Sequence, residues 1–475
     1  MAGIVAYGSY IPFFRLARAE IARNWGIATQ PGEKAVASYD EDSLTMAVAA
    51  ALDCVKGIDM NCVDGLYFAS TTSPYKEKQC AATISTILGI PATAITMDFG
   101  GSLRSGTNAL KAAADAVNSG SARNILVCAA DSRLGYPSGA FEMAFGDGAA
   151  ALLIGKKDTI AEIIKFYSNY RDIQDVWRSD RDQFVRSGED RFSMDEGYTA
   201  GVSETVTALL KQSGLKAADF NKAALYAPNA RQLAAMAQKL GFDPKTQVPD
   251  NLHQSVGDTG SANALLSLIN IIEKASQGEK MLLASYGNGC DAFILETTAL
   301  VAGNKKKTSL QSGIKAKSLV TNYSKFLRWR ELVTTQPAAR PPLEERQPTP
   351  SAQWRESQWE LRLTGTKCKH CGTPQYPKQR VCINCGTKDE YEAYTFFDKP
   401  AKAFSFSHDY VMASVEPPVT VTIVDFEGGG RLMCDMTDRV PEEIKVGIPL
   451  EMTFRRLYYV GGIYNYWWKC KPVRV

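Results

Sequence analysis

The stretch at residues 97–110, MDFGGSLRSGTNAL, constrains the fold of this chain more than any other. An apolar run over 94–97 predicts a strand before it, and helical spacing over 107–117 predicts a helix after it. Gly100 and Gly101 permit a sharp turn between the two, because glycine adopts backbone angles that other residues avoid. A strand, turn and helix of this kind present one side chain beside the helix N-terminus, whose free N–H groups favour an anion.

Leu103 occupies this turn, although enzymes that transfer acyl groups place a nucleophile on such a turn. No cysteine lies between Cys80 and Cys128, so a small shift of register does not supply one. We therefore expect no acyl-cysteine at this position. The backbone N–H of Leu103 keeps its capacity to bind a negatively charged oxygen, because it lies at the helix N-terminus.

Length, charge and cysteine content set the class of protein. A chain of 475 residues is long enough for two or three domains, and a net charge of +3 is too small to indicate a nucleic-acid or membrane surface. No apolar run reaches the ~20 residues that span a bilayer, and the N-terminus lacks the pattern of a signal peptide. The 11 cysteines, four of them in paired spacing, fit a reducing compartment. We expect a cytoplasmic protein with no membrane or nucleic-acid partner.

Strand and helix patterns alternate over the first 300 residues. The predicted strands cover 4–10, 65–69, 124–130, 149–154, 223–227, 280–285 and 293–297, and the predicted helices cover 15–25, 43–55, 76–88, 199–212, 231–240 and 260–275. This alternation predicts an α/β fold with buried sheets, built from two similar halves. Residues 166–195 are charged and aromatic without a clear period, and we interpret them as an excursion that covers the active site.

Five short stretches in the first domain carry a resemblance to a known family. They are 3–12 (GIVAYGSYIP), 40–47 (DEDSLTMA), 141–148 (FEMAFGDG), 227–231 (APNAR) and 285–289 (SYGNG). On these residues the chain, from Met1 to about Arg330, resembles the thiolase superfamily, and most of all the archaeal and bacterial type of hydroxymethylglutaryl-CoA synthase. The resemblance implies a thiolase-like, duplicated α/β/α/β/α domain that binds acyl-CoA.

The three residues that perform the chemistry of that family are replaced here. The resemblance places the family's Glu at Thr71, its Cys at Leu103 and its His at Tyr226. The resemblance therefore supports the fold and the binding of acyl-CoA, and it argues against the family's own reaction.

The backbone amides of the family's active site do not depend on the three replaced side chains. The resemblance implies that the N–H of Leu103 and an N–H in the loop around Gly287 bind the thioester oxygen. Such donors stabilise an enolate by about 3 kcal/mol each, with or without a cysteine. An enolate is the intermediate shared by Claisen, aldol and retro-aldol reactions, and the retro-aldol reaction needs no acyl-enzyme.

Three side chains are candidates for proton transfer. Tyr226 stands at the position of the family's His, and its ordinary pKa near ~10 means that it must be tuned down or act as an acid. Asp258, in the sequence GDTGS, is a candidate base, and His253 lies five residues earlier. The alternatives remain open that Tyr226 packs, Asp258 forms a turn and His253 is structural.

Further positions are candidates for substrate contact. They are Thr71, Arg104, Asn229, Arg231, Tyr286 and Cys290. Arg104 places a cation beside a helix N-terminus, which predicts an anionic partner, either a substrate carboxylate or a nearby Asp or Glu. The resemblance implies that Asn229 and Arg231 lie near the acyl chain and coenzyme A. Cys290 is either an inert buried thiol or, as the lesser alternative, the nucleophile.

A second module starts near residue 351 with two cysteine pairs. Cys368 and Cys371 form one Cys-x-x-Cys pair, and Cys382 and Cys385 form the next. Two such pairs predict a structural zinc ion, because four sulfur ligands fill a tetrahedral shell and leave no open position for catalysis.

The strand pattern after residue 390 predicts a small β-barrel. From Trp354 to the C-terminus the module resembles the zinc-ribbon/OB-fold proteins that accompany thiolase-like enzymes. The alternative, nucleic-acid binding through aromatic faces, is weaker because the chain is nearly neutral. The expected organisation is a thiolase-like domain at 1–332, a Pro-rich linker at 333–350, a helix and zinc ribbon at 351–390, and an OB-fold domain at 391–475.

These features predict an enzyme that makes or breaks a carbon–carbon bond next to a thioester. Aldol or retro-aldol chemistry on a β-hydroxyacyl-CoA is the first hypothesis, because thiolase-like aldolases of steroid side-chain breakdown also lack the cysteine, use tyrosine and work with a zinc-ribbon/OB partner. A Claisen-type synthase or acyltransferase and a non-catalytic acyl-CoA scaffold are the alternatives. We expect a homodimer or dimer-based oligomer, and a second thiolase-like or hydratase subunit remains an open alternative as a partner.

Overall fold

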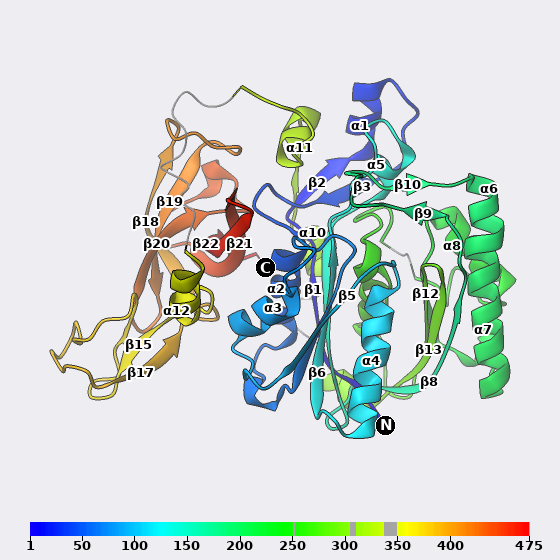
Figure 1. Cartoon of the computed structure of the whole chain (residues 1–475), viewed down its shortest axis with the longest axis horizontal. Coiled ribbons are helices and arrows are strands. Elements are labelled where there is room, and N and C mark those ends of the chain that lie inside the picture. Colours follow the sequence, from blue (N-terminus) through cyan, green and yellow to red (C-terminus); the bar gives the residue numbers. More distant parts are fainter. Residues whose placement is uncertain (250–251, 305–309, 337–348, 475) are drawn as a thin grey trace. The chain divides into compact units, whose positions relative to one another are not determined.

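The computed structural model describes residues 1–249, 252–304, 310–336 and 349–474 (Figure 1). They fall into two compact units. The first comprises Met1–Ala37, Asp42–Ser85 and Ile90–Tyr323, and the second comprises Ser38–Glu41, Thr86–Gly89 and Ser324–Val475.

A nine-stranded mixed sheet forms the frame of the first unit, in the order β11-β12-β13-β8-β1-β7-β6-β4-β5. Its strands are β1 (Gly3–Tyr10), β4 (Gly65–Ala69), β5 (Ile95–Phe99), β6 (Asn124–Asp131), β7 (Gly148–Gly155), β8 (Ala161–Tyr170), β11 (Lys222–Leu225), β12 (Lys280–Tyr286) and β13 (Gly289–Thr297). Most of their residues are buried, because helices cover the sheet.

The pairing of these strands repeats itself. In the first half β4 is parallel to β6, β6 is antiparallel to β7, and β7 is antiparallel to β1. In the second half β11 is parallel to β12, β12 is antiparallel to β13, and β13 is antiparallel to β8. This repetition confirms the predicted duplicated α/β fold.

Two helices pack in the interior and bring their N-terminal ends to the functional region. Helix α4 (Ser105–Ser119) ends at Gly120, whose φ of 82° is left-handed, and α9 (Asn263–Ile272) is buried along its whole length. Both contribute to the main hydrophobic core, together with residues from both halves of the sheet. A side chain at Gly106 would meet the Ser261 carbonyl oxygen at 2.3 Å, so the start of α4 lies against the turn before α9.

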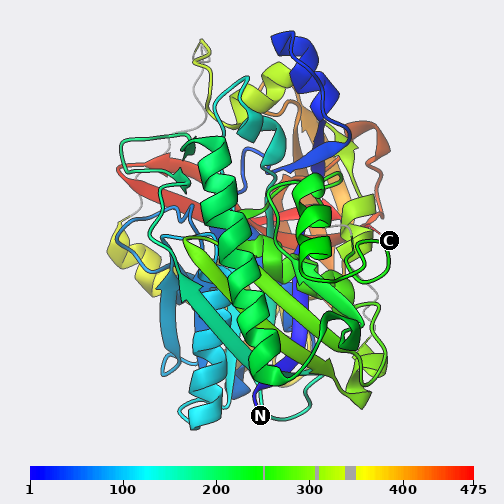
Figure 2. The ribbon, with the colours of Figure 1, turned by 90° about the vertical axis from the view of Figure 1, so that its right-hand side faces the viewer.

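Other helices cover the outside of the sheet. Helix α2 (Ser43–Cys54) begins at Asp42, whose carboxylate accepts a hydrogen bond from the Thr45 N–H at 2.9 Å. Helix α7 (Ala200–Ser213) lies along the face of the second half of the sheet (Figure 2), where it shares a core with β12, β13 and α8 (Ala230–Lys239).

Two predicted helices begin later than their sequence pattern suggested. The pattern over 15–25 is a strand, β2 (Phe14–Ala17), followed by α1 (Arg18–Trp25), because β2 pairs with β3 (Glu33–Val36) and with the distant β14 (Ser318–Leu319). Helix α3 (Cys80–Leu88) begins at Cys80 because the Asp98 carboxylate accepts hydrogen bonds from the N–H groups of Cys80 and Ala81.

The second unit contains a small sheet and a closed barrel. The sheet consists of β15 (Thr364–Cys368), β16 (Pro374–Gln375) and β17 (Tyr391–Thr395), and helix α12 (Pro350–Glu360) precedes it. The barrel consists of β18 (Ala401–Asp409), β19 (Val419–Phe426), β20 (Arg431–Met436), β21 (Pro449–Val460) and β22 (Ile463–Pro472). Strand β22 was not predicted as a separate strand, since only two glycines separate it from β21.

The predicted domain boundaries stay predictions. The ribbon and the barrel belong to the same compact unit, and the predicted linker lies mostly outside the described residues, which omit 337–348. The helix α11 (Tyr323–Trp329) lies before residue 332, the predicted end of the first domain, but from Ser324 on it belongs to the second compact unit.

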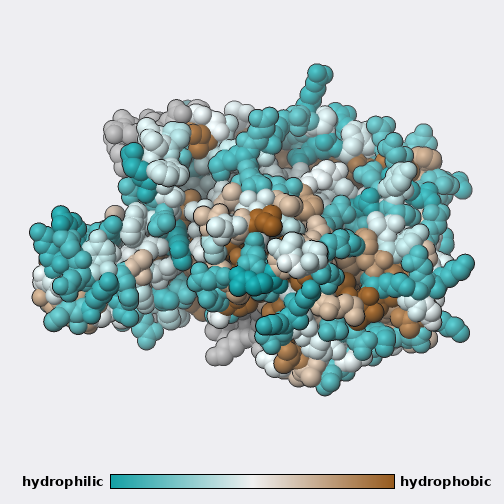
Figure 3. Space-filling view, turned by 60° about the horizontal axis from the view of Figure 1, so that its bottom comes forward, coloured by the Kyte–Doolittle hydropathy of each residue, from teal (hydrophilic) through white to brown (hydrophobic). Residues whose placement is uncertain are grey.

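The surface is mixed in character. Figure 3 shows a face on which hydrophilic residues predominate and hydrophobic residues form separate areas. None of the helices in the described ranges is long and apolar enough to cross a bilayer.

Candidate functional site

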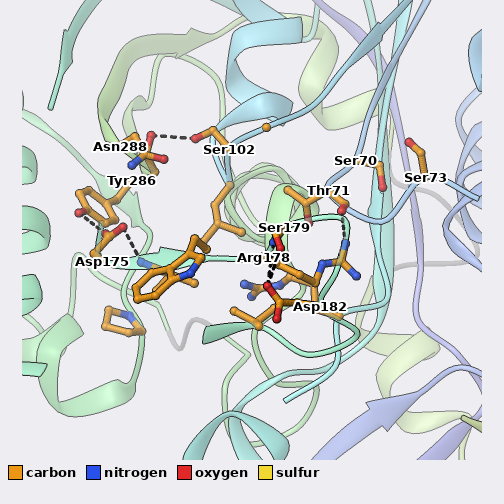
Figure 4. Close-up of a pocket in the computed structure, with 18 of the residues that line it drawn as sticks. Ser70, Thr71, Ser73, Ser102, Asp175, Arg178, Ser179, Asp182, Tyr286 and Asn288 are labelled. Atoms are coloured by element: carbon orange, nitrogen blue, oxygen red, sulfur yellow. Dashed lines mark hydrogen bonds between the residues drawn. The ribbon is translucent and has the colours of Figure 1, made fainter. Parts of the chain in front are cut away.

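A cavity of about 520 Å³ opens in the first unit beside the start of α4 (Figure 4). Its wall includes five of the residues predicted from the sequence: Thr71, Leu103, Tyr226, Tyr286 and Gly287. These residues come from segments that are far apart in the chain, so the fold brings the predicted site together around one cavity.

The turn that carries Leu103 lies directly against the loop that carries Gly287. The Ser102 hydroxyl donates to the Gly287 carbonyl oxygen at 2.8 Å. A Cβ atom at Gly287 would lie only 2.9 Å from the Arg104 nitrogen and 3.0 Å from the Leu103 nitrogen. Glycine is therefore required at 287, because this approach leaves no room for a side chain.

The structure changes which amide of this loop is available to a ligand. The Gly287 N–H donates to the Gly289 carbonyl oxygen at 2.9 Å, so it is engaged within the loop. Asn288, which lines the cavity with a φ of 51°, and Leu103 have backbone N–H groups without an acceptor among the described residues. The backbone N–H groups of Leu103 and Asn288 are therefore two candidate donors for an oxyanion, and the predicted donor in the loop around Gly287 stays a prediction with Asn288 as its candidate.

Tyr226 belongs to a buried group of three polar side chains. Its hydroxyl donates to Asp258 Oδ2 at 3.1 Å, and Arg133 Nη2 lies 2.7 Å from the same oxygen. The Gly260 N–H donates to the other carboxylate oxygen at 2.9 Å. The Arg133 guanidinium also lies 4.0 Å above the Phe145 ring, which fixes its orientation. Tyr226 and Arg133 line the cavity, whereas Asp258 lies behind them.

Burial and charge set the protonation of this group. Burial, followed by the Asp258 charge, raises the pKa of Tyr226 well above its usual value, so the phenol stays protonated and donates a hydrogen bond. Burial acts against the ionised form of Asp258, but the charges of Arg133 and His253 hold its pKa below the usual range. A carboxylate stabilised in this way is a poor proton acceptor, so the geometry suits Asp258 to holding the phenol.

His253 lies outside the cavity wall. Its Nε2 atom is 2.6 Å from the Ala227 carbonyl oxygen, and its side chain is buried. This placement fits the structural alternative, in which His253 supports the strand end at Tyr226 and the charge of Asp258.

Four other predicted contact residues also lie outside the wall. Arg104 meets Asp291 at 3.2 Å, which matches the expected nearby acid. Cys290 is fully buried, and burial followed by the Asp291 charge raises the pKa of its thiol, so the thiol stays protonated. The Asn229 side chain caps α8 by accepting from the Gln232 N–H at 2.9 Å, and Arg231 is exposed on the same helix.

Thr71 lines the cavity, and its backbone is held in place on both sides. Its N–H donates to the Asp131 carboxylate at 2.7 Å, and its carbonyl oxygen accepts from Arg178 at 2.6 Å. The buried Thr71 hydroxyl has no hydrogen-bond partner among the described residues.

The segment after β8 contributes residues that the sequence analysis did not single out. Residues 166–170 belong to β8, and the segment continues through β9 (Val176–Trp177), β10 (Arg186–Ser187) and the short helix α6 (Asp190–Phe192) into a π-helical turn, η2 (Ser193–Thr199). From this segment Asp175, Trp177, Arg178, Met194 and Tyr198 line the cavity. The Tyr198 hydroxyl donates to the Tyr226 carbonyl oxygen at 3.0 Å. The aromatic and charged composition of this segment predicted that it covers the site. A segment without periodicity does not reveal which of its side chains point into the cavity.

The four cysteines of the second unit gather as a metal site would require. All four Sγ atoms lie within 4.8 Å of one another, with 3.7 Å between Cys368 and Cys385 and 3.5 Å between Cys371 and Cys382. Four sulfurs bound tetrahedrally to zinc at ~2.3 Å lie about 3.8 Å apart. These residues therefore fit a structural zinc ion.

Family models match both units. The model for 3-oxoacyl-[acyl-carrier-protein (ACP)] synthase III matches residues 97–170, and the model for its C-terminal part matches 210–296. A rubredoxin-like zinc ribbon domain and a C-terminal OB-fold domain, both described from ChsH2, match 360–390 and 392–455. The predicted zinc ribbon and OB-fold are therefore confirmed.

Curated relatives extend the similarity over most of the first unit. The hydroxymethylglutaryl-CoA synthase of Pyrococcus horikoshii is 33% identical over 298 residues, which cover 61% of this chain and 85% of the relative. That of Caldivirga maquilingensis is 30% identical over 342 residues, which cover 70% of this chain and 98% of the relative.

Solved structures agree in fold. A crystal structure of a hydroxymethylglutaryl-CoA synthase complexed with CoA superimposes with a TM-score of 0.64 at 19% identity, covering 73% of this chain and 95% of the other. MvaS in complex with 3-hydroxy-3-methylglutaryl coenzyme A gives 0.63 at 20% identity, covering 72% and 94%. With the relatives, these findings show that the chain belongs to the hydroxymethylglutaryl-CoA synthase family of thiolase-like enzymes and carries an additional zinc ribbon and OB-fold domain.

Proposed function

We propose that this protein is an acyl-CoA enzyme that makes or breaks a carbon–carbon bond next to the thioester by aldol chemistry on a β-hydroxyacyl-CoA, without an acyl-cysteine. One observation carries the proposal. Leu103 stands at the turn on which a nucleophile would be placed, while two unoccupied amides and the protonated phenol of Tyr226 border the same cavity.

The amides and the phenol have separate tasks in this reaction. The N–H groups of Leu103 and Asn288 hold the thioester oxygen, which becomes negative in the enolate, and each donor is worth about 3 kcal/mol. Tyr226 exchanges a proton with the 3-oxygen of the substrate. In the direction of addition the phenol protonates the alkoxide that forms when the enolate attacks a carbonyl group. Asp258 and Arg133 hold the phenol in place.

The test uses a panel of β-hydroxyacyl-CoA esters of different chain lengths. We expect the wild-type protein to release a carbonyl compound, trapped as a hydrazone, and a shorter acyl-CoA, identified by mass spectrometry. The mass of the intact protein should show no acyl adduct. A stable adduct would overturn the proposal, and binding of the esters without turnover of any of them would indicate a scaffold.

A Claisen-type condensation is the second candidate, because the curated relatives are hydroxymethylglutaryl-CoA synthases. It requires a thiolate at the acyl group. Cys290 is the cysteine of the glycine loop, but it is buried behind the cavity wall with a raised pKa. Loss of turnover in Cys290→Ser would favour this second candidate over the aldol reaction.

We also propose a homodimer. Strand β5 is an edge strand of the nine-stranded sheet, and its Ile95 and Met97 side chains are exposed. An edge strand with unpaired backbone groups and exposed apolar side chains favours pairing with a second copy. Light scattering of the wild-type protein and of Met97→Lys would test this assembly.

A further inference from the structure

Chemistry next to a thioester needs a group that exchanges a proton with the Cα carbon. The resemblance places the family's glutamate at Thr71, whose hydroxyl is not a base at neutral pH. Tyr226 is assigned to the 3-oxygen in the proposed function. A carboxylate in the cavity wall is the natural candidate for the remaining proton transfer.

Three carboxylates line the cavity, and they differ in environment. Asp180 is 80% exposed and pairs with Lys76 at 3.1 Å. Asp182 is paired with Arg186 at 2.6 Å. Asp175 is 6% exposed, and no Lys or Arg of the described part of the chain forms an ion pair with it. Asp175 is therefore the buried carboxylate of the wall that forms no ion pair in the described part of the chain.

Hydrogen bonds hold Asp175 close to the amides that would bind the thioester oxygen. Its Oδ2 atom accepts from the Tyr286 hydroxyl at 2.5 Å, and its Oδ1 atom accepts from the Val176 N–H at 2.6 Å. Tyr286 directly precedes the loop that contains Asn288. Figure 4 shows Asp175 and Tyr286 on the same side of the cavity as Asn288, away from Thr71.

A glycine of the π-helical turn closes over this pair. A Cβ atom at Gly197 would lie 2.5 Å from the Tyr286 hydroxyl oxygen and 3.6 Å from Asp175 Oδ2. The backbone of η2 therefore packs closely against this pair, and Asp175 lines the cavity.

We propose that Asp175 is the acid/base that exchanges the Cα proton, an assignment that rests on the proposed aldol function. In the direction of addition, the Asp175 carboxylate takes one proton from Cα, and the electron pair of the broken C–H bond forms the enolate. The enolate carbon attacks the carbonyl carbon, and Tyr226 gives its phenolic proton to the alkoxide. One proton is taken and one is given, so solvent resets the site by carrying a proton from Asp175 to Tyr226. The cleavage direction reverses each step.

The two proton transfers can be measured separately. The probe is acetyl-CoA in D₂O without a carbonyl acceptor, because its Cα hydrogens exchange only through the enolate. The wild-type protein should exchange these hydrogens. Asp175→Asn, which keeps the size of the side chain, should lose about 10²- to 10⁴-fold of the exchange rate. Asp172→Asn, an exposed position in the same segment, is the matched control and should exchange at the wild-type rate.

A conservative variant separates catalysis from folding. Asp175→Glu should regain part of the exchange rate, and Asp175→Asn should lower kcat with little change in KM for acetyl-CoA. Exchange by Asp175→Asn at the wild-type rate would overturn the assignment while leaving the aldol reaction standing. A parallel loss of acetyl-CoA binding in both Asp175 variants would also overturn it, since the residue would then only shape the site. Absence of both cleavage and exchange in the wild-type protein would instead defeat the proposed function.

Discussion

Two tyrosine–aspartate pairs border the same cavity in different electrostatic surroundings. Tyr226 donates to Asp258, and Arg133 lies 2.7 Å from the same carboxylate oxygen. Tyr286 donates to Asp175, which receives a backbone N–H as its second partner. Arginine beside a buried carboxylate stabilises its charge and holds its neighbours in place, whereas Asp175 forms no ion pair in the described part of the chain. In the proposed reaction the first pair holds the phenol in place and the second pair moves the Cα proton.

The largest effect should come from Tyr226→Phe, which removes the proton donor and keeps the ring. We expect kcat for the carbon–carbon step to fall about 10²- to 10⁴-fold, because a positioned acid/base contributes that much. Steady-state kinetics on a β-hydroxyacyl-CoA measures it. Tyr170→Phe, at an 83% exposed position, is the control and should retain wild-type kinetics. Equal activity in both variants would remove Tyr226 from the mechanism.

Arg133→Met should lower the stability of the protein, because it removes the cation beside the Tyr226–Asp258 pair. It leaves the buried Asp258 charge without its cation, and such losses cost about 3–5 kcal/mol in the free energy of unfolding. The loss is measured as a change in the free energy of unfolding of the first unit, in a denaturant titration. The double variant Arg133→Met/Asp258→Asn should recover a substantial part of it, and failure to recover would show that Arg133 stabilises mainly by packing on Phe145.

Tyr286→Phe should cost less than the loss of Arg133. Asp175 keeps its backbone donor, so the expected loss is about 1–3 kcal/mol, the cost of removing one partner of a buried polar group. The same denaturant measurement tests it. A loss as large as that of Arg133→Met would contradict the distinction between the two pairs.

The smallest effect should appear as a pH dependence. The folded pKa of Asp258 lies below its ordinary value of 3.8, so its contribution to stability is present at neutral pH. That contribution is lost as pH falls below about 4 through the folded pKa, at about 1.4 kcal/mol per unit of depression. Stability curves between pH 2 and 7 should therefore fall less steeply for Asp258→Asn than for the wild-type protein. Parallel curves would show that Asp258 is not held ionised.

Local signals in the sequence predicted the parts of the molecule that depend on local chemistry. The helix after the turn at Gly100 and Gly101, the helix over 43–55 and the four gathered cysteines were all predicted from residue type and spacing. Strand β2 was not, because its pairing with residues beyond 300 overrides a helical pattern.

The site also contains some features that were predicted from the sequence and others that only the fold reveals. The position of Tyr226 in the cavity wall was predicted from a resemblance, but its partner Arg133 was not, since no spacing links residues 133 and 258. The hydrogen bond from the Gly287 N–H to the Gly289 carbonyl oxygen depends on the conformation of the loop, which residue types alone do not reveal. Asp175 lies in a segment without periodicity, so only the fold shows that it is buried.

The π-helical turn η2 has a consequence for how this site diversifies. Its wider winding places Ser193, Met194 and Tyr198 together on the cavity side, although an α-helix would rotate the first of them away from the last. Deleting one residue would restore α-helical winding and turn this wall, while α7 would continue in its place. Homologues adapted to other acyl groups are therefore expected to differ here by single-residue insertions and deletions more than by substitutions, a length polymorphism that retunes selectivity in one evolutionary step.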